Sequence, residues 1–243
     1  MSQTESAKII AILQPSYLPW LGYFDQIKRS DVFVFYDDVA FDKHGWRNRN
    51  RINSANGPLW LSVPVRHKGH SGQLIKDVKI DNSRAWYQKH LRSLQQQYAR
   101  SEFLPELVSE LDRIYQQKSD YLIDLNLSLI QLFMRLLGIR ANLVLSSELN
   151  ISGSQSQRLL NICQHFSAHT YLSGDAAKSY LDLPLFREAG VDVQWQYYAH
   201  PVYEQYHGRQ HKCAFTPYLS IVDLLLSQGE KSRTFFTGSE EAS

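Results

Sequence analysis

The chain has 243 residues, 43% of them hydrophobic and 21% charged, which are ordinary values for a globular protein. Its formal net charge of +2 gives no overall electrostatic reason to expect a nucleic acid or an anionic membrane as partner. The two cysteines are too few for a disulfide framework or a zinc site, and free thiols suit the cytoplasm. We therefore expect a cytoplasmic protein without a metal centre, and we expect no membrane span, since no apolar stretch approaches about 18 residues.

The segment 8–24 is the most distinctive part of the sequence. Its apolar run 9–13 predicts a buried strand, and residues 21–29 predict a helix. In open α/β sheets ligands bind just beyond the carboxyl end of such a strand, and the N-terminus of the next helix favours an anion. The loop between them holds two prolines and several aromatic rings. It is therefore expected to form one wall of a ligand site, with the candidates Gln14, Tyr17, Trp20, Gly22 and Tyr23; the alternative is a stiff turn whose aromatic rings belong to the core.

Asp37 and Asp38 follow a second predicted strand, residues 31–36. A strand–helix–strand unit this short implies a parallel pair joined by a right-handed crossover, so these carboxylates lie at the same sheet edge as the first loop. Because neighbouring residues of a strand point to opposite sides, we expect only one of the two to face a ligand. That carboxylate suits a ribose hydroxyl, an ammonium group or Mg²⁺; the alternative is a turn cap.

The loop expected over residues 39–57 is basic, and residues 44–51 contain three arginines and no acid. Arginine presents a planar fork that suits phosphate and carboxylate groups, and an aromatic ring beside it can stack on a base or a sugar. The predicted anion site comprises Lys43, Trp46, Arg47, Asn48 and Arg49. A solvated loop is the alternative, and RNA binding is less favoured because nucleic-acid-binding domains are usually strongly basic.

The remaining pattern predicts alternating strands and helices on either side of a helical middle. Strands are expected at 60–65, 141–145, 169–174 and 191–197, with a short one at 75–80, and a polar, mobile loop at 66–73. One helix starts at a cap formed by Asn82 or Ser83, one at Pro105, and one at Ser119 or Asp120 and ends at Gly138. Later helices are expected at 156–166 and 217–228.

This alternation predicts an α/β fold with a mostly parallel sheet. We expect a single domain over residues 8–236, with a helical insertion at about 82–138, and disordered ends at 1–7 and 237–243. Ser173 and Gly174 lie at the end of the predicted strand 169–174, just as the first loop lies at the carboxyl end of the strand 9–13. Tyr203 and Gln205 belong to a later aromatic and polar cluster, and both pairs are further binding candidates.

Several motifs together resemble the WbqC-like family, and the resemblance runs from about Ile9 to Gly229. They are QPSYLPWLGYF, DVFVFYDDVAFDKHGWRNRNRI, YLSG, VYEQ and LSIVDLL. The resemblance implies a bacterial cytosolic enzyme that modifies a sugar or a similar metabolite in O-antigen, other surface or secondary-metabolite pathways. It brings no settled mechanism.

The opening is also similar to that of the nucleotidylyltransferase and pantothenate-synthetase group, which has a Rossmann-like start and binds ATP phosphates through a His-x-Gly-His-like motif. The corresponding residues are Trp20-Leu21-Gly22-Tyr23, so the glycine is kept and both histidines are replaced. This departure argues against ATP as a cofactor.

The resulting hypothesis is an acyl- or aminoacyltransferase, or an amide-forming ligase, that acts on a nucleotide-linked amino sugar. Lys43, Arg47 and Arg49 would hold phosphates, and Asp37 or Asp38 would orient an amine or hydroxyl. Lys43 and the two aspartates are the catalytic candidates. The alternatives are a non-catalytic module that binds sugar nucleotides and an RNA-binding protein; the oligomeric state stays open.

Overall fold

The computed structural model describes residues 8–66, 72–206 and 214–236. The predicted disordered ends, most of the predicted mobile loop 66–73 and Cys213 lie outside these ranges. The chain forms two compact units. Unit 1 combines the residues up to Gln14 with Asp25–Asp38 and Arg140–Ala199, and unit 2 combines Pro15–Phe24, Val39–Ile139 and the residues from His200 onward.

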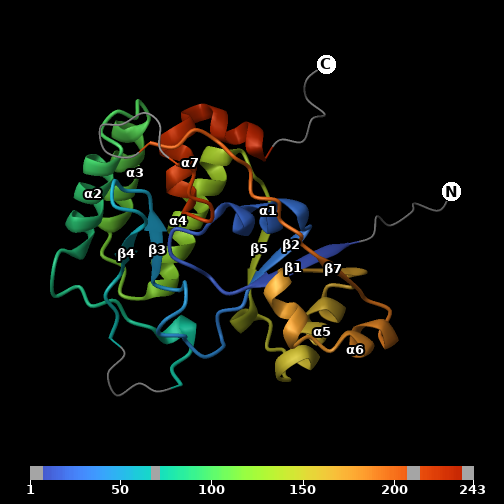
Figure 1. Ribbon diagram of the computed structural model, residues 1–243. Helices are drawn as coiled ribbons and strands as arrows, with labels where there is room; N and C mark the ends of the chain where they lie inside the picture. Colours follow the sequence, from blue (N-terminus) through green and yellow to red (C-terminus); the bar gives the residue numbers. More distant parts are fainter. Residues whose placement is uncertain (1–7, 67–71, 207–213, 237–243) are drawn as a thin grey trace. The chain divides into compact units, whose positions relative to one another are not determined.

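Unit 1 is built on a five-stranded parallel sheet (Figure 1). The strands, in their order across the sheet, are β5 (Asn142–Leu145), β2 (Val32–Phe35), β1 (Ile9–Leu13), β6 (Thr170–Ser173) and β7 (Asp192–Trp195). Every neighbouring pair is parallel, which confirms the predicted α/β fold with a mostly parallel sheet. The chain moves outward from β1 to β2 and β5, and then returns to the other side of β1 with β6 and β7. The strand order therefore reverses between β1 and β6, which is the topological switch point of a doubly wound sheet.

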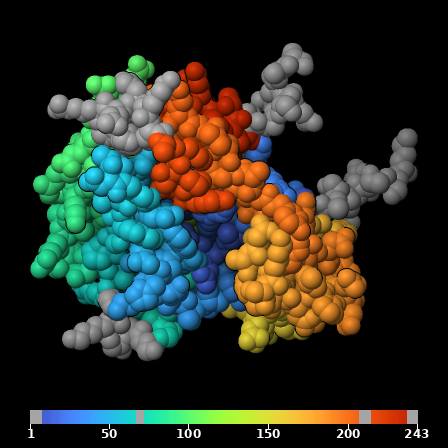
Figure 2. Space-filling model, viewed as in Figure 1, coloured from blue at the N-terminus to red at the C-terminus, as the bar shows by residue number. Residues whose placement is uncertain are grey.

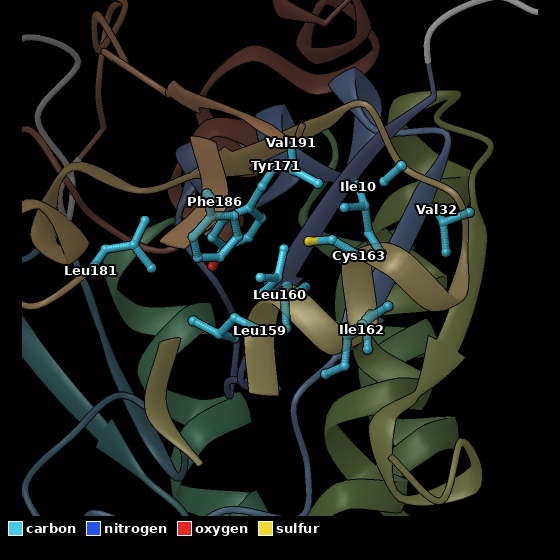
Figure 3. Close-up of a cluster of buried hydrophobic side chains, with 13 residues drawn as sticks. Ile10, Val32, Leu159, Leu160, Ile162, Cys163, Tyr171, Leu181, Phe186 and Val191 are labelled. Atoms are coloured by element: carbon cyan, nitrogen blue, oxygen red, sulfur yellow. The ribbon is translucent and has the colours of Figure 1, made fainter. Parts of the chain in front are cut away.

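One face of this sheet packs on α5 (Gln155–His165) and α6 (Leu183–Glu188). Alternate residues of a strand point to the same face, so β1 contributes Ile10 and Ile12 to this packing and leaves Ala11 on the other face. Tyr171 of β6 stacks on Phe186 of α6 with ring centroids 5.5 Å apart. Figure 3 shows this core, whose other members include Val32, Val34, Leu159, Leu160, Ile162, Cys163, Leu181 and Val191.

The long helices of unit 2 each bury apolar side chains. They are α2 (Trp86–Gln97), α3 (Leu104–Tyr115), α4 (Leu122–Leu137) and α7 (Ile221–Gln228), and 3-10 helix Gly229–Phe235 follows α7. The same unit contains a two-stranded antiparallel hairpin of β3 (Arg49–Ile52) and β4 (Leu59–Ser62). Helix α1 (Leu21–Arg29) begins and ends where the sequence predicts. Among the described helices α4 contributes the largest number of buried residues, because its apolar residues recur at helical spacing on more than one face.

Several local predictions were wrong. The expected loop 39–57 contains β3, whose arginines alternate with buried residues. The expected strand 75–80 begins instead as 3-10 helix Ile75–Asp77. Helices α2 and α4 follow Ala85 and Tyr121 without a side-chain cap. The amide of Asn82 is used elsewhere, since it accepts from the indole N–H of Trp86 and donates to the Ser119 carbonyl.

One predicted helix end and one predicted helix start were correct. Gly138 ends α4 in the left-handed region at φ 70°, and Pro105 lies in the first turn of α3. Within the described ranges, no helix combines the length and the apolar character that crossing a membrane requires.

Candidate functional site

The reversal of strand order in unit 1 brings together three predicted site residues. Gln14 directly follows β1, Ser173 is the last residue of β6, and Gly174 follows it. β1 and β6 are hydrogen-bonded neighbours in parallel register, with Ala11 opposite Leu172, so their carboxyl ends meet at one edge. We call Gln14, Ser173 and Gly174 the switch-point site.

A chain of amide hydrogen bonds borders Gly174. Gln26 Nε2 donates to Gln196 Oε1 at 2.7 Å, and Gln196 Nε2 donates to a carboxylate oxygen of Asp25 at 2.8 Å. The carboxylate accepts only, so it fixes the orientation of both amides. A Cβ atom added at Gly174 would lie 3.4 Å from Gln26 Nε2, so the Gln26 amide packs directly against this turn. Arg29 also donates to the Gln196 carbonyl at 3.0 Å.

A second polar cluster lies where β2 and β5 end. Asp37 is buried and accepts from the Ser147 backbone N–H at 2.9 Å and from the Ser147 hydroxyl at 2.6 Å. The Ser146 hydroxyl lies 3.0 Å from Asp37 Oδ1 and also contacts Asp38 Oδ1. A hydroxyl has one hydrogen, so it donates to only one of the two carboxylates at a time. Asp38 completes the cluster through an ion pair with Arg158.

Both aspartates therefore meet at Ser146, against the expectation that they point to opposite sides. The reason is that β2 ends at Phe35, and strand alternation no longer applies beyond it. Burial raises the pKa of Asp38, but the hydrogen bonds from Arg158 and Ser146 outweigh burial and hold that pKa below its usual value. Asp38 keeps some exposure whereas Asp37 is 1% exposed, so Asp38 is the more accessible of the two carboxylates.

Tyr17 and Tyr23 are core residues of unit 2. The Tyr17 hydroxyl lies 2.8 Å from His90 Nδ1 and 2.6 Å from the Tyr115 hydroxyl. Burial raises the pKa of Tyr17 and Tyr23 and lowers the pKa of His90 to about 4. Because Tyr17 is 0% exposed, its placement gives no support to stacking on a ligand, and the core alternative explains it.

Gly22 accommodates the side chain of Trp20. A Cβ atom at Gly22 would lie 2.2 Å from the Trp20 indole, so the glycine is required by the close approach of this ring. Trp20 in turn packs edge-on against Tyr218, with centroids 5.7 Å apart. The resemblance to nucleotidylyltransferases would place this glycine in a motif that holds ATP phosphates. Here an indole covers the glycine, so the fit to ATP is poor.

The basic segment divides into packing residues and surface residues. Asn48 donates to the Val63 carbonyl at 2.9 Å and helps to hold the hairpin. Arg47 is half-buried, and its carbonyl accepts from Asn126 at 2.9 Å; burial lowers the pKa of its guanidinium. Lys43 is exposed, and Trp46 lies beside the outer face of the hairpin that carries Arg49.

Tyr203 and Gln205 surround a buried carboxylate. They donate to Asp223 Oδ2 at 2.9 and 2.8 Å, and Tyr98 donates to Oδ1 at 2.6 Å. Burial raises the pKa of Asp223 to about 6, although the hydrogen bonds oppose this shift. Both binding candidates are buried, so the placement indicates that they hold the segment before α7 in position.

The family model described as the WbqC-like protein family matches residues 14–235. The chain belongs to the WbqC-like family. A relative named "Uncharacterized protein Rv1507c", from Mycobacterium tuberculosis (strain ATCC 25618 / H37Rv), is 37% identical over 227 residues, which cover 93% of this chain and 96% of the relative. No solved structure gives a significant match.

In this WbqC-like protein the predicted site residues fall in two units. Gln14, Asp37, Asp38, Ser173 and Gly174 belong to unit 1, and the other candidates belong to unit 2. Sequence reasoning missed Ser146 and Ser147, although they follow the predicted strand 141–145 just as Asp37 follows its strand. It also missed Gln196, which lay inside the predicted strand 191–197, whereas β7 ends at Trp195. It also missed Gln26 and Arg158, which lie inside helices where no strand-end or motif signal marks them.

Proposed function

We propose that the switch-point site binds a nucleotide-linked amino sugar and that the protein transfers an acyl or aminoacyl group to the amine of that sugar. The reversal of strand order between β1 and β6 carries the proposal, because open α/β sheets bind nucleotides at such a point. Gly174 supports it, since a residue without a side chain lets a ribose or phosphate approach the backbone. The reaction class and its place in surface-polysaccharide or secondary-metabolite synthesis rest on the family resemblance.

In the proposed reaction the amine nitrogen forms a bond to the carbonyl carbon of an acyl donor. The bond between that carbon and its leaving group breaks, and the leaving group departs with the proton of the amine. Asp38 is the proposed orienting group, because it is ionised and partly exposed at the same sheet edge. Asp37 would hold the Ser146–Ser147 turn.

Binding tests the first half of the proposal. We expect UDP- or dTDP-linked amino sugars to bind in calorimetric titrations and Gly174→Val to weaken binding at least tenfold, about 1.4 kcal/mol. Gly174 has φ −69°, which valine adopts without strain. Ala176→Val, at an exposed position in the 3-10 helix Asp175–Ser179, is the matched control and should bind normally. Equal binding by both variants would remove the switch-point assignment.

Product formation tests the second half. Each sugar nucleotide is incubated with acetyl-coenzyme A, or with amino acids and ATP, and mass spectrometry detects the mass added to the amine. A matched sugar nucleotide with a hydroxyl in place of the amine should bind but gain no mass. Asp38→Asn should bind and lose product. Binding without product for every donor would support a non-catalytic module that binds sugar nucleotides. The hydrogen bonds from Ser146 and Ser147 to both carboxylate oxygens of Asp37 favour this alternative, because they give Asp37 a structural role.

A further inference from the structure

A cluster of two tryptophans and two arginines covers the outer face of the β3–β4 hairpin in unit 2. Arg49 and Arg51 alternate with the buried Asn50 and Ile52, so both guanidinium groups lie on the same face. Arg51 is paired directly across the hairpin with Trp60. Trp46 lies against Trp60. We call Trp46, Arg49, Arg51 and Trp60 the Trp–Arg patch.

The four side chains of the patch form one stack. The rings of Trp46 and Trp60 have centroids 5.3 Å apart at an interplanar angle of 26°. The guanidinium carbon of Arg49 lies 4.5 Å from the Trp60 centroid, and that of Arg51 lies 5.4 Å from Trp46 and 5.6 Å from Trp60. Each such exposed contact contributes about 0.5–1 kcal/mol, which reduces the freedom of both arginines before any ligand binds.

The positive charge of this patch is not neutralised by neighbouring carboxylates. In the described part of the chain, neither Arg49 nor Arg51 has an ion pair, whereas Arg29, Arg113, Arg135 and Arg158 each have one. The Nε atoms of Arg49 and Arg51 are buried and have no hydrogen-bond partner among the described residues, whereas Nη2 of Arg49 donates to the His44 carbonyl. The buried face of the hairpin is anchored, since Asn50 Nδ2 donates to the Leu18 carbonyl at 2.7 Å.

The indole rings remain available beside these guanidinium groups. Trp46 is 41% exposed and Trp60 is 44% exposed, which is high for so large an apolar side chain. Figure 2 shows the light-blue and cyan segment of the hairpin region at the surface. A ligand that satisfies both features carries an oxyanion for the guanidinium forks and a planar or sugar group for the indoles.

We propose that the Trp–Arg patch is a second ligand site, separate from the switch-point site, and that it binds nucleoside diphosphates. The diphosphate contacts Arg49 and Arg51, and the base or ribose lies against the exposed surface of Trp46. A small nucleotide fits better than RNA, because the patch has two guanidinium groups on a chain of net charge +2, whereas RNA-binding domains are strongly basic.

Fluorine NMR of the full chain, labelled with 5-fluorotryptophan, reads the two sites separately. The protein has five tryptophans: Trp20, Trp46, Trp60, Trp86 and Trp195. Single Trp→Phe variants assign the resonances. Trp46 and Trp60 report on the patch, and Trp195, the last residue of β7, reports on the carboxyl edge of the sheet in unit 1. The probes are UDP, ADP, inorganic pyrophosphate and a short single-stranded RNA.

We expect UDP and ADP to shift the Trp46 and Trp60 resonances with saturable curves, and pyrophosphate to bind more weakly because it lacks the base. Arg49→Gln combined with Arg51→Gln should raise the dissociation constant at least tenfold. Arg51→Lys keeps the charge but loses the planar fork, and should give an intermediate value. Arg92→Gln combined with Arg100→Gln removes the same charge from exposed positions and should change nothing.

The proposal is overturned if neither nucleotide moves the Trp46 and Trp60 resonances, or if the double glutamine variant binds as the unsubstituted chain does. It is also overturned if RNA binds at the patch at least tenfold more tightly than the nucleotides, with a steep dependence on salt. A shift of Trp195 that Gly174→Val abolishes reports on the proposed function alone. Failure at one site is therefore distinguishable from failure at the other.

Discussion

The hydroxyl of Tyr98 donates to Oδ1 of Asp223 at 2.6 Å, and both side chains are fully buried. The same hydroxyl accepts from the backbone N–H of Asn53 at 2.9 Å. Tyr98 directly follows α2, Asp223 lies in the first turn of α7, and Asn53 begins the loop between β3 and β4. One phenol therefore joins two helices and the connecting loop of the hairpin.

Tyr98→Phe should destabilise the protein by about 1–3 kcal/mol, because it leaves a buried carboxylate oxygen and a buried N–H without this partner. The change is measured as the free energy of unfolding in urea. Tyr180→Phe is the matched control, since Tyr180 is 68% exposed, and it should stay within about 0.5 kcal/mol of the unsubstituted protein. Equal effects of the two substitutions would contradict the buried network.

The ionisation of Asp223 should make part of the stability depend on pH. Its pKa is raised from 3.8 to about 6, so the folded state holds this proton more tightly than the unfolded chain does. The resulting stabilisation is fully present below about pH 4 and is lost as the pH rises through about 6, a change of about 3 kcal/mol at most. In Asp223→Asn this contribution should be absent from the pH profile of the free energy of unfolding.

His90 should act in the opposite direction over the same range. Burial lowers its pKa from 6.5 to about 4, so its contribution is present above about pH 6.5 and is lost as the pH falls toward 4. The two groups therefore offset each other between about pH 4 and 6. Relative to the unsubstituted protein, Asp223→Asn should lose more stability on acidification and His90→Gln should lose less. Parallel profiles for the three proteins would contradict both assignments.

Gly22→Ala tests the close approach of Trp20. The added methyl would lie 2.2 Å from the indole, so the ring must move off its contact with Tyr218, and we expect a cost of about 1–3 kcal/mol. In a Trp20→Ala background the same substitution should cost less than about 0.5 kcal/mol. The double-mutant cycle isolates this coupling, and additive effects would show that the ring does not cover the glycine.

The prediction of a single domain over residues 8–236 is testable with the same variants. If the two compact units unfold together, the melting curves of a unit 1 probe, Trp195, and a unit 2 probe, Trp86, should coincide. Tyr98→Phe, which alters unit 2, should then lower both midpoints equally. A lower midpoint for Trp86 alone would show that the units are separate domains.

The parallel sheet was predictable because its strands are short apolar runs bounded by polar residues. The strands at 9–13 and 32–35 are predicted by their apolar composition and by the short helix between them. β3 was missed for the opposite reason: RNRI reads as polar, and it is a strand only because Asn50 and Ile52 are anchored beneath it. Tertiary contacts override local propensity at such positions.

The candidate site was predictable only where strand ends mark it. Gln14, Ser173 and Gly174 follow from that rule, and so does the position of Asp37 and Asp38. The aromatic residues near the predicted site were a poor guide to ligand binding, because the sequence does not distinguish an exposed ring from a ring in the core. Tyr17 is 0% exposed, whereas Trp46 is 41% exposed. Gln26 and Gln196 meet across the fold, and their hydrogen bond has no counterpart in the local sequence.

The interleaving of the two units constrains how the chain can fold during synthesis. β1 lies between β2 and β6, and Ile10 is paired with Val32 on one side and with Tyr171 on the other. The second pairing cannot form until Tyr171 has been synthesised. Unit 2 likewise needs α7, near the end of the described residues, to enclose Asp223. Neither hydrophobic core can close on a partly synthesised chain, and non-local pairing of this kind slows folding. Strand edges that stay unpaired until such distant partners meet are sites of aggregation during folding.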